Sequence, residues 1–160
     1  MGIQGDVDMP LDWNVVSSIA TAFASIATAI GVAFCGIQLK LTKKQSQAEF
    51  EDRLDQQYRE ISMALPVDVL IGQDAEEEKA GEIRELIYNY LDLTNEQVYL
   101  RAKGRVSNHT WSSWSSGIEA HMKKKAFTEV FDEIKDFSAF TYLERLVKDW
   151  FKSDPAHWYK

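Results

Sequence analysis

The chain has 160 residues, of which 45% are hydrophobic and 27% charged, and its formal net charge is −7. This composition excludes a disordered or collagen-like chain, and a single cysteine excludes a disulfide framework and a cysteine-ligated zinc site. The charges are unevenly placed, since residues 13–39 contain no Asp, Glu, Lys or Arg. The sequence therefore predicts a membrane segment joined to a soluble domain.

The apolar segment is long enough to cross a bilayer. Residues 15–39 form an apolar run, and about 20 helical residues span a hydrocarbon core about 30 Å thick. We expect a transmembrane helix over residues 13–39, preceded by a short extracytoplasmic segment, residues 1–12. A cleaved signal peptide is the alternative, but it requires a basic start, whereas Asp6, Asp8 and Asp12 precede this run.

Lysines set the predicted orientation. Lys40, Lys43 and Lys44 follow the apolar run directly, and positive charge stays on the cytoplasmic side of a membrane. This pattern predicts a single pass of a bacterial inner membrane, with the N-terminus outside and residues 40–160 in the cytoplasm.

One face of the predicted span carries small hydroxyl side chains at alternating steps of four and three. The packing positions are Ser18, Thr21, Ser25 and Thr28. Such stripes allow transmembrane helices to approach closely, which predicts a homo-oligomer in the bilayer, with a tetramer or a larger assembly as candidates. The alternative is that each hydroxyl bonds to its own helix backbone four residues earlier.

The apolar rhythm continues beyond the lysines. Residues 40–65 predict a connecting amphipathic helix that ends before Pro66, and residues 66–160 predict a helical domain continuous with it. The short apolar run Val67 to Ile71 is compatible with a helix or a strand.

The remaining chain predicts four further amphipathic helices. The first runs from Glu82 to Leu100, and Gly104 is a natural stop after it. Ser107 or Asn108 then caps a helix with Trp111, Trp114, Ile118 and Met122 on one side. The last two stretches are Phe127 to Ile134 and Phe140 to Phe151. The predicted fold class is all-α, a transmembrane helix followed by a cytosolic bundle of about five helices.

Basic residues gather in one stretch of this acidic chain. Residues 97–125 hold six Lys or Arg against Glu119, a balance of +5, while the rest sums to −12. Basic side chains bind phosphate oxygens, a capped helix start offers backbone N–H groups, and aromatic rings stack bases. The predicted nucleotide-binding residues are Arg101, Lys103, Arg105, Asn108, His109, Trp111 and Trp114. Alternatively, the two tryptophans are core residues, and Arg101 or Arg105 pairs with an acidic partner.

Catalytic constellations are missing from the sequence. Helical ribonucleases of the HEPN type have four to six residues between an Arg and the His that follows it, but seven residues separate Arg101 from His109 and three separate Arg105 from it. There is no Gly-rich phosphate loop, Ser–His–acid set or metal-spaced carboxylate cluster. We therefore expect no catalytic residues, no metal and no enzymatic activity.

Three stretches resemble a recurrent pattern in small bacterial proteins that have one N-terminal transmembrane helix and a helical cytosolic domain. They are residues 90–100, 103–106 and 110–118. Within this group the chain resembles the membrane effectors of type III CRISPR systems, whose cytosolic domain binds cyclic tetra-adenylate and disturbs the membrane of an infected cell. It is also similar to the pore-forming partner of a type VI CRISPR nuclease, apart from the Arg–His spacing.

The resemblance implies an antiviral-defence effector. Its activating ligand would be cyclic tetra-adenylate, with no other cofactor and no duplex nucleic acid as partner, and binding would gate a pore or disrupt the bilayer. Two other hypotheses stay open, namely a membrane-anchored adaptor that recruits a protein partner and a degenerate ribonuclease that depends on His109.

Overall fold

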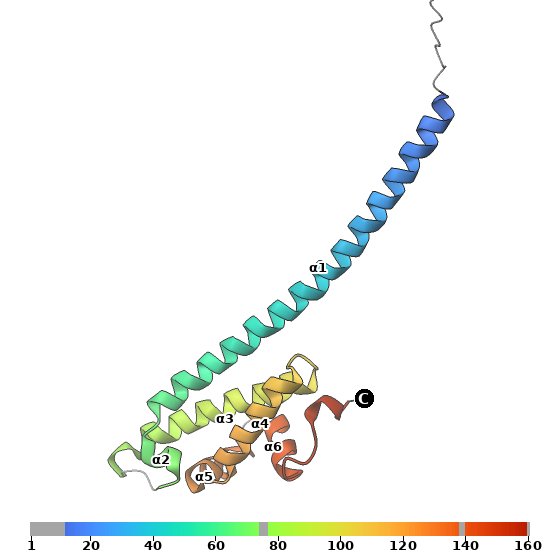
Figure 1. Cartoon of the computed structure of the whole chain (residues 1–160). Coiled ribbons are helices and arrows are strands. Elements are labelled where there is room, and N and C mark those ends of the chain that lie inside the picture. The colour runs from blue at the N-terminus through green and yellow to red at the C-terminus, as the bar shows by residue number, and fades with distance from the viewer. Residues whose placement is uncertain (1–11, 74–76, 138–139, 160) are drawn as a thin grey trace, which may run out of the picture. The chain divides into compact units, whose positions relative to one another are not determined.

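The computed structural model describes residues 12–73, 77–137 and 140–159, so the predicted extracytoplasmic segment, residues 1–12, lies outside it except for Asp12. Within the described ranges the chain forms six α-helices, two short 3-10 helices and no strand, which confirms the all-α prediction for them (Figure 1). The elements are α1 (Trp13–Ala64), α2 (Val67–Ile71), η1 (Glu77–Lys79), α3 (Ala80–Ala102), α4 (Asn108–Met122), α5 (Lys125–Ile134), α6 (Thr141–Lys148) and η2 (Pro155–His157).

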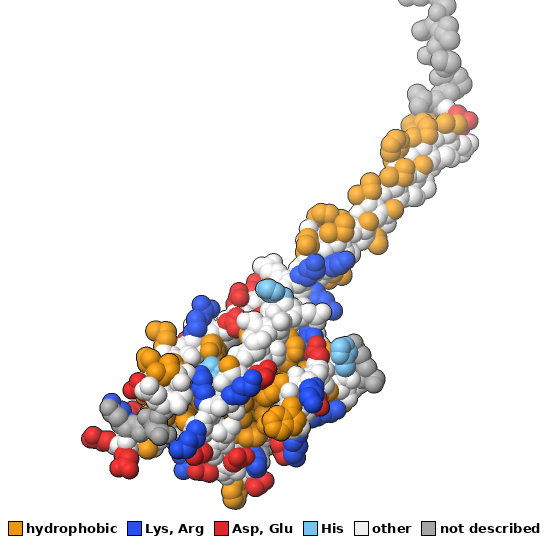
Figure 2. Space-filling model, turned by 60° about the horizontal axis from the view of Figure 1, so that its bottom comes forward, with side chains coloured by type: hydrophobic (Ala, Val, Ile, Leu, Met, Phe, Trp, Pro, Cys, Tyr) orange, Lys and Arg blue, Asp and Glu red, His pale blue; other side chains and the backbone are white. Residues whose placement is uncertain are grey.

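The chain divides into two compact units, Met1–Lys44 and Gln45–Lys160, and α1 contributes residues to both. In the first unit every described residue is exposed, and Figure 2 shows hydrophobic side chains along this part of α1. Its most apolar stretch has a mean hydropathy of 1.9 with no residue buried. By length and composition this helix is able to cross a membrane, a property that a signal sequence near an N-terminus shares.

The hydroxyls of the predicted packing stripe bond to their own helix. Ser18 Oγ, Thr21 Oγ1 and Ser25 Oγ each donate to the carbonyl oxygen four residues earlier at 2.8 Å, and Thr28 Oγ1 does so at 2.9 Å. These four hydrogen bonds satisfy the hydroxyl protons within one helix. What the stripe contributes to packing between helices is therefore the small size of its side chains, which permits close approach.

The second unit is built around α3. This helix packs against α5, α6 and η2, and α4 packs against α5. Val67 to Ile71 forms a helix, the first of the two states that its pattern allows. The core contains the apolar positions predicted for the helices, including Leu54 of α1, Ile87 and Leu91 of α3, Phe127 of α5 and Leu143 of α6.

The turn between α3 and α4 follows the predicted signals, whereas the end of α6 does not. Gly104 adopts φ 69°, the left-handed conformation that glycine allows at low cost, and Ser107 caps α4 by accepting from Thr110 N at 3.2 Å. The prediction for the last stretch was wrong beyond Lys148, where α6 ends. Trp150 is 79% exposed with φ 53°, because the chain turns there instead of continuing the apolar face.

Candidate functional site

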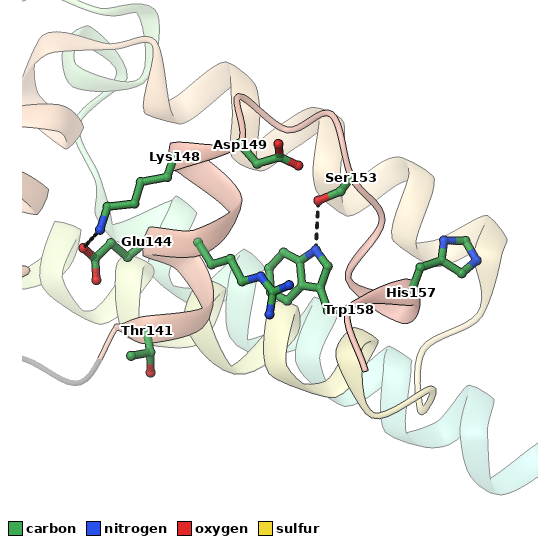
Figure 3. A pocket seen from close by; sticks show the side chains of 8 residues that line it. Thr141, Glu144, Lys148, Asp149, Ser153, His157 and Trp158 are labelled. Atoms are coloured by element: carbon green, nitrogen blue, oxygen red, sulfur yellow. Dashed lines mark hydrogen bonds and ion pairs between the residues drawn. The ribbon is translucent and has the colours of Figure 1, made fainter. Parts of the chain in front are cut away.

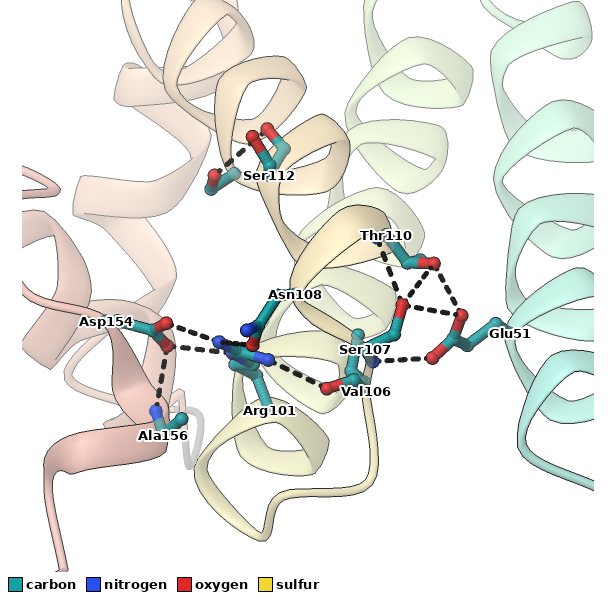
Figure 4. Close-up of polar contacts among 10 residues, drawn as sticks. Glu51, Arg101, Val106, Ser107, Asn108, Thr110, Ser112, Asp154 and Ala156 are labelled. Atoms are coloured by element: carbon teal, nitrogen blue, oxygen red, sulfur yellow. Dashed lines mark hydrogen bonds and ion pairs between the residues drawn. The ribbon is translucent and has the colours of Figure 1, made fainter. Parts of the chain in front are cut away.

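Arg101 lies inside the second unit and is fully engaged there. The residue is 5% exposed, and its Nε donates to Asp154 Oδ1 at 2.8 Å while Nη2 pairs with Asp154 Oδ2. Nη1 donates to the Val106 carbonyl oxygen and Nη2 to Asn108 Oδ1, each at 2.8 Å (Figure 4). The arginine thus fastens the C-terminal segment to the turn between α3 and α4.

The structure does not bring the seven predicted ligand residues into one pocket. Trp111 and Trp114 are 6% and 8% exposed and belong to the core, as the alternative interpretation held, and Arg101 pairs with an acidic partner as that interpretation also held. The side chains of Lys103, Arg105 and His109 are exposed. None of them lines the groove described below, but Lys103 contacts the ring of Tyr159, which follows a residue of that groove in the chain.

A carboxylate that the sequence analysis did not single out holds the start of α4. Glu51 of α1 accepts from Ser107 N at 2.6 Å and from Thr110 Oγ1 at 2.5 Å (Figure 4). A negative charge at a helix N-terminus is stabilised by the helix dipole and by the free N–H groups of the first turn. In this protein the anion at that position is therefore one of its own side chains, and the capped helix start is not open to a phosphate.

A groove lies between α6 and the C-terminal segment, which we call the C-terminal groove (Figure 3). Its volume is about 700 Å³. It is lined by Thr141, Glu144, Arg145, Lys148, Asp149, Ser153, His157 and Trp158. Trp158 is oriented by a hydrogen bond from its Nε1 to Ser153 Oγ of 2.8 Å.

Arg145 is the side chain in this groove best suited to an anion. Its guanidinium carbon lies 4.3 Å from the centroid of the Trp158 ring. Lys148 pairs with Glu144 at 2.6 Å, but no carboxylate among the described residues pairs with Arg145. A guanidinium over an aromatic ring keeps its five N–H donors in its own plane, where they can bind phosphate or carboxylate oxygens.

A second cation, in the turn after α3, shares an aromatic ring with Arg145. Lys103 Nζ lies 5.4 Å from the Tyr159 ring centroid and 5.6 Å from that of Tyr99, and Arg145 lies 5.6 Å from the Tyr159 centroid. One tyrosine ring therefore contacts both cations. Two positive charges at Tyr159, one of them also over Trp158, form a cationic and aromatic arrangement, in which Lys103 is the one predicted ligand residue.

Two features hold the C-terminal segment in this place. Asp154, paired with Arg101, also accepts from Ala156 N at 2.9 Å and so caps η2. Trp150 and Phe151 both have positive φ values, 53° and 57°, which bulky residues rarely adopt. They reverse the chain after α6 so that Ser153 to Tyr159 returns along it.

An aromatic cluster joins the part of α1 from Gln45 onward to the other helices of the second unit. His121 lies 4.9 Å from the Tyr90 ring and 5.0 Å from the Phe127 ring, and Tyr58 of α1 lies 6.3 Å from it. His121 Nδ1 contacts the Gly117 carbonyl oxygen at 2.8 Å, so Nδ1 carries the proton. Burial lowers the pKa of His121, an effect that the Gly117 contact opposes and the nearby Lys124 charge reinforces.

This shift predicts a loss of stability in mild acid. The histidine pKa is lower in the folded than in the unfolded chain, so its contribution is complete above about pH 6.5 and is lost as the pH falls toward the folded value. We expect the free energy of unfolding to fall below about pH 6.5, by at most about 1.4 kcal/mol per pH unit from this group. Urea titrations from pH 8 to pH 5 measure the free energy of unfolding at each pH. The variant His121→Asn, which keeps a donor for Gly117, should lack the part of the pH dependence that comes from His121. An unchanged slope in the variant would contradict the assignment.

No group of three or more His, Cys, Asp or Glu residues in the described parts of the chain is arranged to hold a metal ion. Comparison with known proteins found no matching family model, no matching curated protein and no matching solved structure.

Proposed function

We propose that this protein is a single-pass membrane protein whose helical domain binds an anionic ligand carrying a planar base in the C-terminal groove, and that it acts as a receptor without catalysing a reaction. The observation that carries the proposal is Arg145 stacked on Trp158 at 4.3 Å with no acidic partner among the described residues. Cation and ring together offer a phosphate contact and a stacking surface in one place.

The proposed site, the C-terminal groove, differs from the site predicted over Arg101 to Trp114. The proposed class of ligand, a nucleotide, is the same. Three of the predicted residues are buried: Arg101, Trp111 and Trp114. In contrast, Lys103 and Arg145 are exposed. The net charge of −7 disfavours duplex nucleic acid, which binds through extended basic surfaces. A nucleotide fits two cations and adjacent rings, and cyclic tetra-adenylate, the ligand implied by the resemblance to type III CRISPR effectors, is the first to test.

The membrane part of the proposal rests on residues 13–39. Their length and hydropathy suit one crossing, and Lys40, Lys43 and Lys44 favour a cytoplasmic domain. The stripe of Ser18, Thr21, Ser25 and Thr28 supports association with further copies. Ligand binding would then alter an oligomer in the bilayer, by gating a pore or by disturbing the lipid.

Calorimetric titration of the full-length protein in detergent with cyclic tetra-adenylate and with ATP tests the ligand class. We expect saturable binding, weakened about tenfold or more by Arg145→Ala and by Lys103→Ala, because each removes a charge-assisted contact. Arg84→Ala is the matched control, since Arg84 of α3 pairs with Glu133 of α5 at 2.5 Å and neither residue lines the C-terminal groove.

Arg105→Ala and His109→Ala separate the groove from the turn between α3 and α4. If these two variants lost binding while Arg145→Ala retained it, the ligand would lie at the turn and the groove assignment would be wrong. If neither nucleotide bound, the receptor proposal itself would fail.

The adaptor hypothesis is favoured by a different surface. Met63, Val67 and Ile71, at the end of α1 and on α2, are 86%, 69% and 62% exposed. Exposed apolar side chains grouped along a few turns are typical of protein contacts. This function predicts that pull-down retrieves a stoichiometric protein partner and that Arg145→Ala leaves the activity in cells intact.

A further inference from the structure

A second, smaller cavity lies within the Gln45–Lys160 unit, where α1, α3 and α4 meet. Its volume is about 200 Å³, and it shares no lining residue with the C-terminal groove. It is lined by Asp55, Tyr58, Tyr90, Gln97, Ser113, Trp114, Gly117 and Ile118. Since one water takes about 30 Å³ in the liquid, the space suits a few waters or one small organic molecule.

Gln97 is a polar residue of this cavity whose amide has no protein partner among the described residues. The residue is 4% exposed, yet its amide makes no hydrogen bond to any residue that the structure describes. Amides in native proteins are nearly always hydrogen-bonded, so the donors and the acceptor of this amide are available to a molecule in the cavity. The amide carbonyl is an acceptor for an N–H donor.

The charge lining the cavity is negative. Among its lining residues Asp55 is the one carboxylate, and none is Lys, Arg or His. Asp55 Oδ1 accepts from Trp114 Nε1 at 2.6 Å, which fixes the carboxylate at the wall, and Oδ2 accepts no hydrogen bond from the described residues. A carboxylate with a free oxygen disfavours an anion and favours a cation that donates hydrogen bonds.

Aromatic side chains provide a further part of the wall. Tyr58 and Tyr90 line the cavity with ring centroids 6.2 Å apart, and Trp114 lies on α4. Burial raises the pKa of the Tyr90 phenol, so that this group stays neutral at physiological pH. Neutral aromatic rings around one carboxylate are the surroundings in which proteins bind ammonium ions.

We propose that this cavity binds a small organic ammonium ion, with Asp55 and the Gln97 carbonyl accepting its N–H bonds and the aromatic residues enclosing its carbon chain. The ligand class differs from that of the groove in charge and in size. Because Asp55 and Tyr58 belong to α1, an occupied cavity would hold the cytosolic part of α1 against α3 and α4.

Ligand-observed NMR titration of the full-length protein in detergent tests this with three probes of equal size: propylammonium, propanol and propionate. We expect saturable binding of propylammonium alone at millimolar concentration. Asp55→Asn should weaken it about tenfold or more, since the variant loses the charge but keeps an acceptor for Trp114. Gln97→Met, which keeps the side-chain volume, should weaken it as well.

Two control variants make the outcome specific. Asp52→Asn removes an exposed carboxylate of α1 and should leave binding unchanged, and so should Arg145→Ala, which separates this site from the groove. The proposal is overturned if propylammonium does not saturate, if propionate or propanol binds equally well, or if both Asp55→Asn and Gln97→Met bind like the unaltered protein. Should Asp55→Asn fail to fold, Gln97→Met decides.

Discussion

Replacing Asp154 with Ala is expected to lower the free energy of unfolding by about 3–5 kcal/mol, the cost of leaving a buried charge without its partner. Only 6% of the Arg101 side chain is exposed, so its guanidinium cannot recover the lost bonds from water. The remaining acceptors, the Val106 carbonyl and Asn108 Oδ1, are neutral. A domain stable by about 5–15 kcal/mol loses a large share of its stability through such a change.

The reverse replacement should cost less. The Asp154 side chain is 29% exposed, so in Arg101→Met the carboxylate can be hydrated in part, and the double variant should cost less than the two single changes together. Urea unfolding followed by tryptophan fluorescence measures all three variants. Asp92→Ala, an exposed carboxylate on α3, is the control and should stay within about 0.5 kcal/mol of the unaltered protein. A similarly small effect of Asp154→Ala would contradict this account of the pair.

Replacing Glu51 with Ala is the second change with a large expected effect, about 2 kcal/mol of unfolding free energy. It leaves Ser107 N and the Thr110 hydroxyl without their acceptor and removes the negative charge at the start of α4. Glu51→Gln keeps one acceptor oxygen and should cost about half as much. Glu49→Ala is the matched control, because that exposed carboxylate accepts from Gln45, at 3.1 Å, and from no other described residue.

The pH dependence offers an independent check on Glu51. Burial alone would raise the pKa of its carboxyl, but hydrogen bonds from Thr110, Ser107 and Gln47 together outweigh burial, and the pKa is lowered. The contribution is therefore present above the unfolded value of about 4.3 and is lost as the pH falls through the folded value. Unfolding of Glu51→Ala followed from pH 7 to pH 3 should show a shallower acid loss than the unaltered protein. Equal acid losses would count against the role assigned to this carboxylate.

Local pattern was sufficient to predict most of the helices. The rhythm of Ile83, Ile87, Tyr90 and Leu91 defines one face of α3, and Gly104 and Ser107 mark the turn to α4, because these signals act within a few residues. The same local signals extended the predicted last helix to Phe151, beyond its observed end at Lys148. Trp150 does not continue the apolar face of α6, because the chain turns after Lys148.

The sites depend on contacts between distant residues, which a single sequence does not reveal. Arg101 and Asp154 are 53 positions apart, and Glu51 and Ser107 are 56 apart. The excess of positive charge in residues 97–125 indicated that cations lie near α4. It did not indicate that Arg101 pairs with Asp154 inside the domain. Arg145 and Trp158 come from an acidic part of the chain, and the aromatic content of the last ten residues was the one signal that pointed there.

The central claim is that the apolar part of α1 crosses a membrane and leaves the helical domain in the cytoplasm. Cys35 is the only cysteine, so a Cys35→Ser background with either Gly5→Cys or Lys152→Cys reports each side separately. Labelling of expressing bacterial cells with a membrane-impermeant maleimide should modify Gly5→Cys in intact spheroplasts and Lys152→Cys only after lysis, with both proteins in the membrane fraction. Recovery of the full-length chain in the soluble fraction, with both positions protected until lysis, would contradict the account.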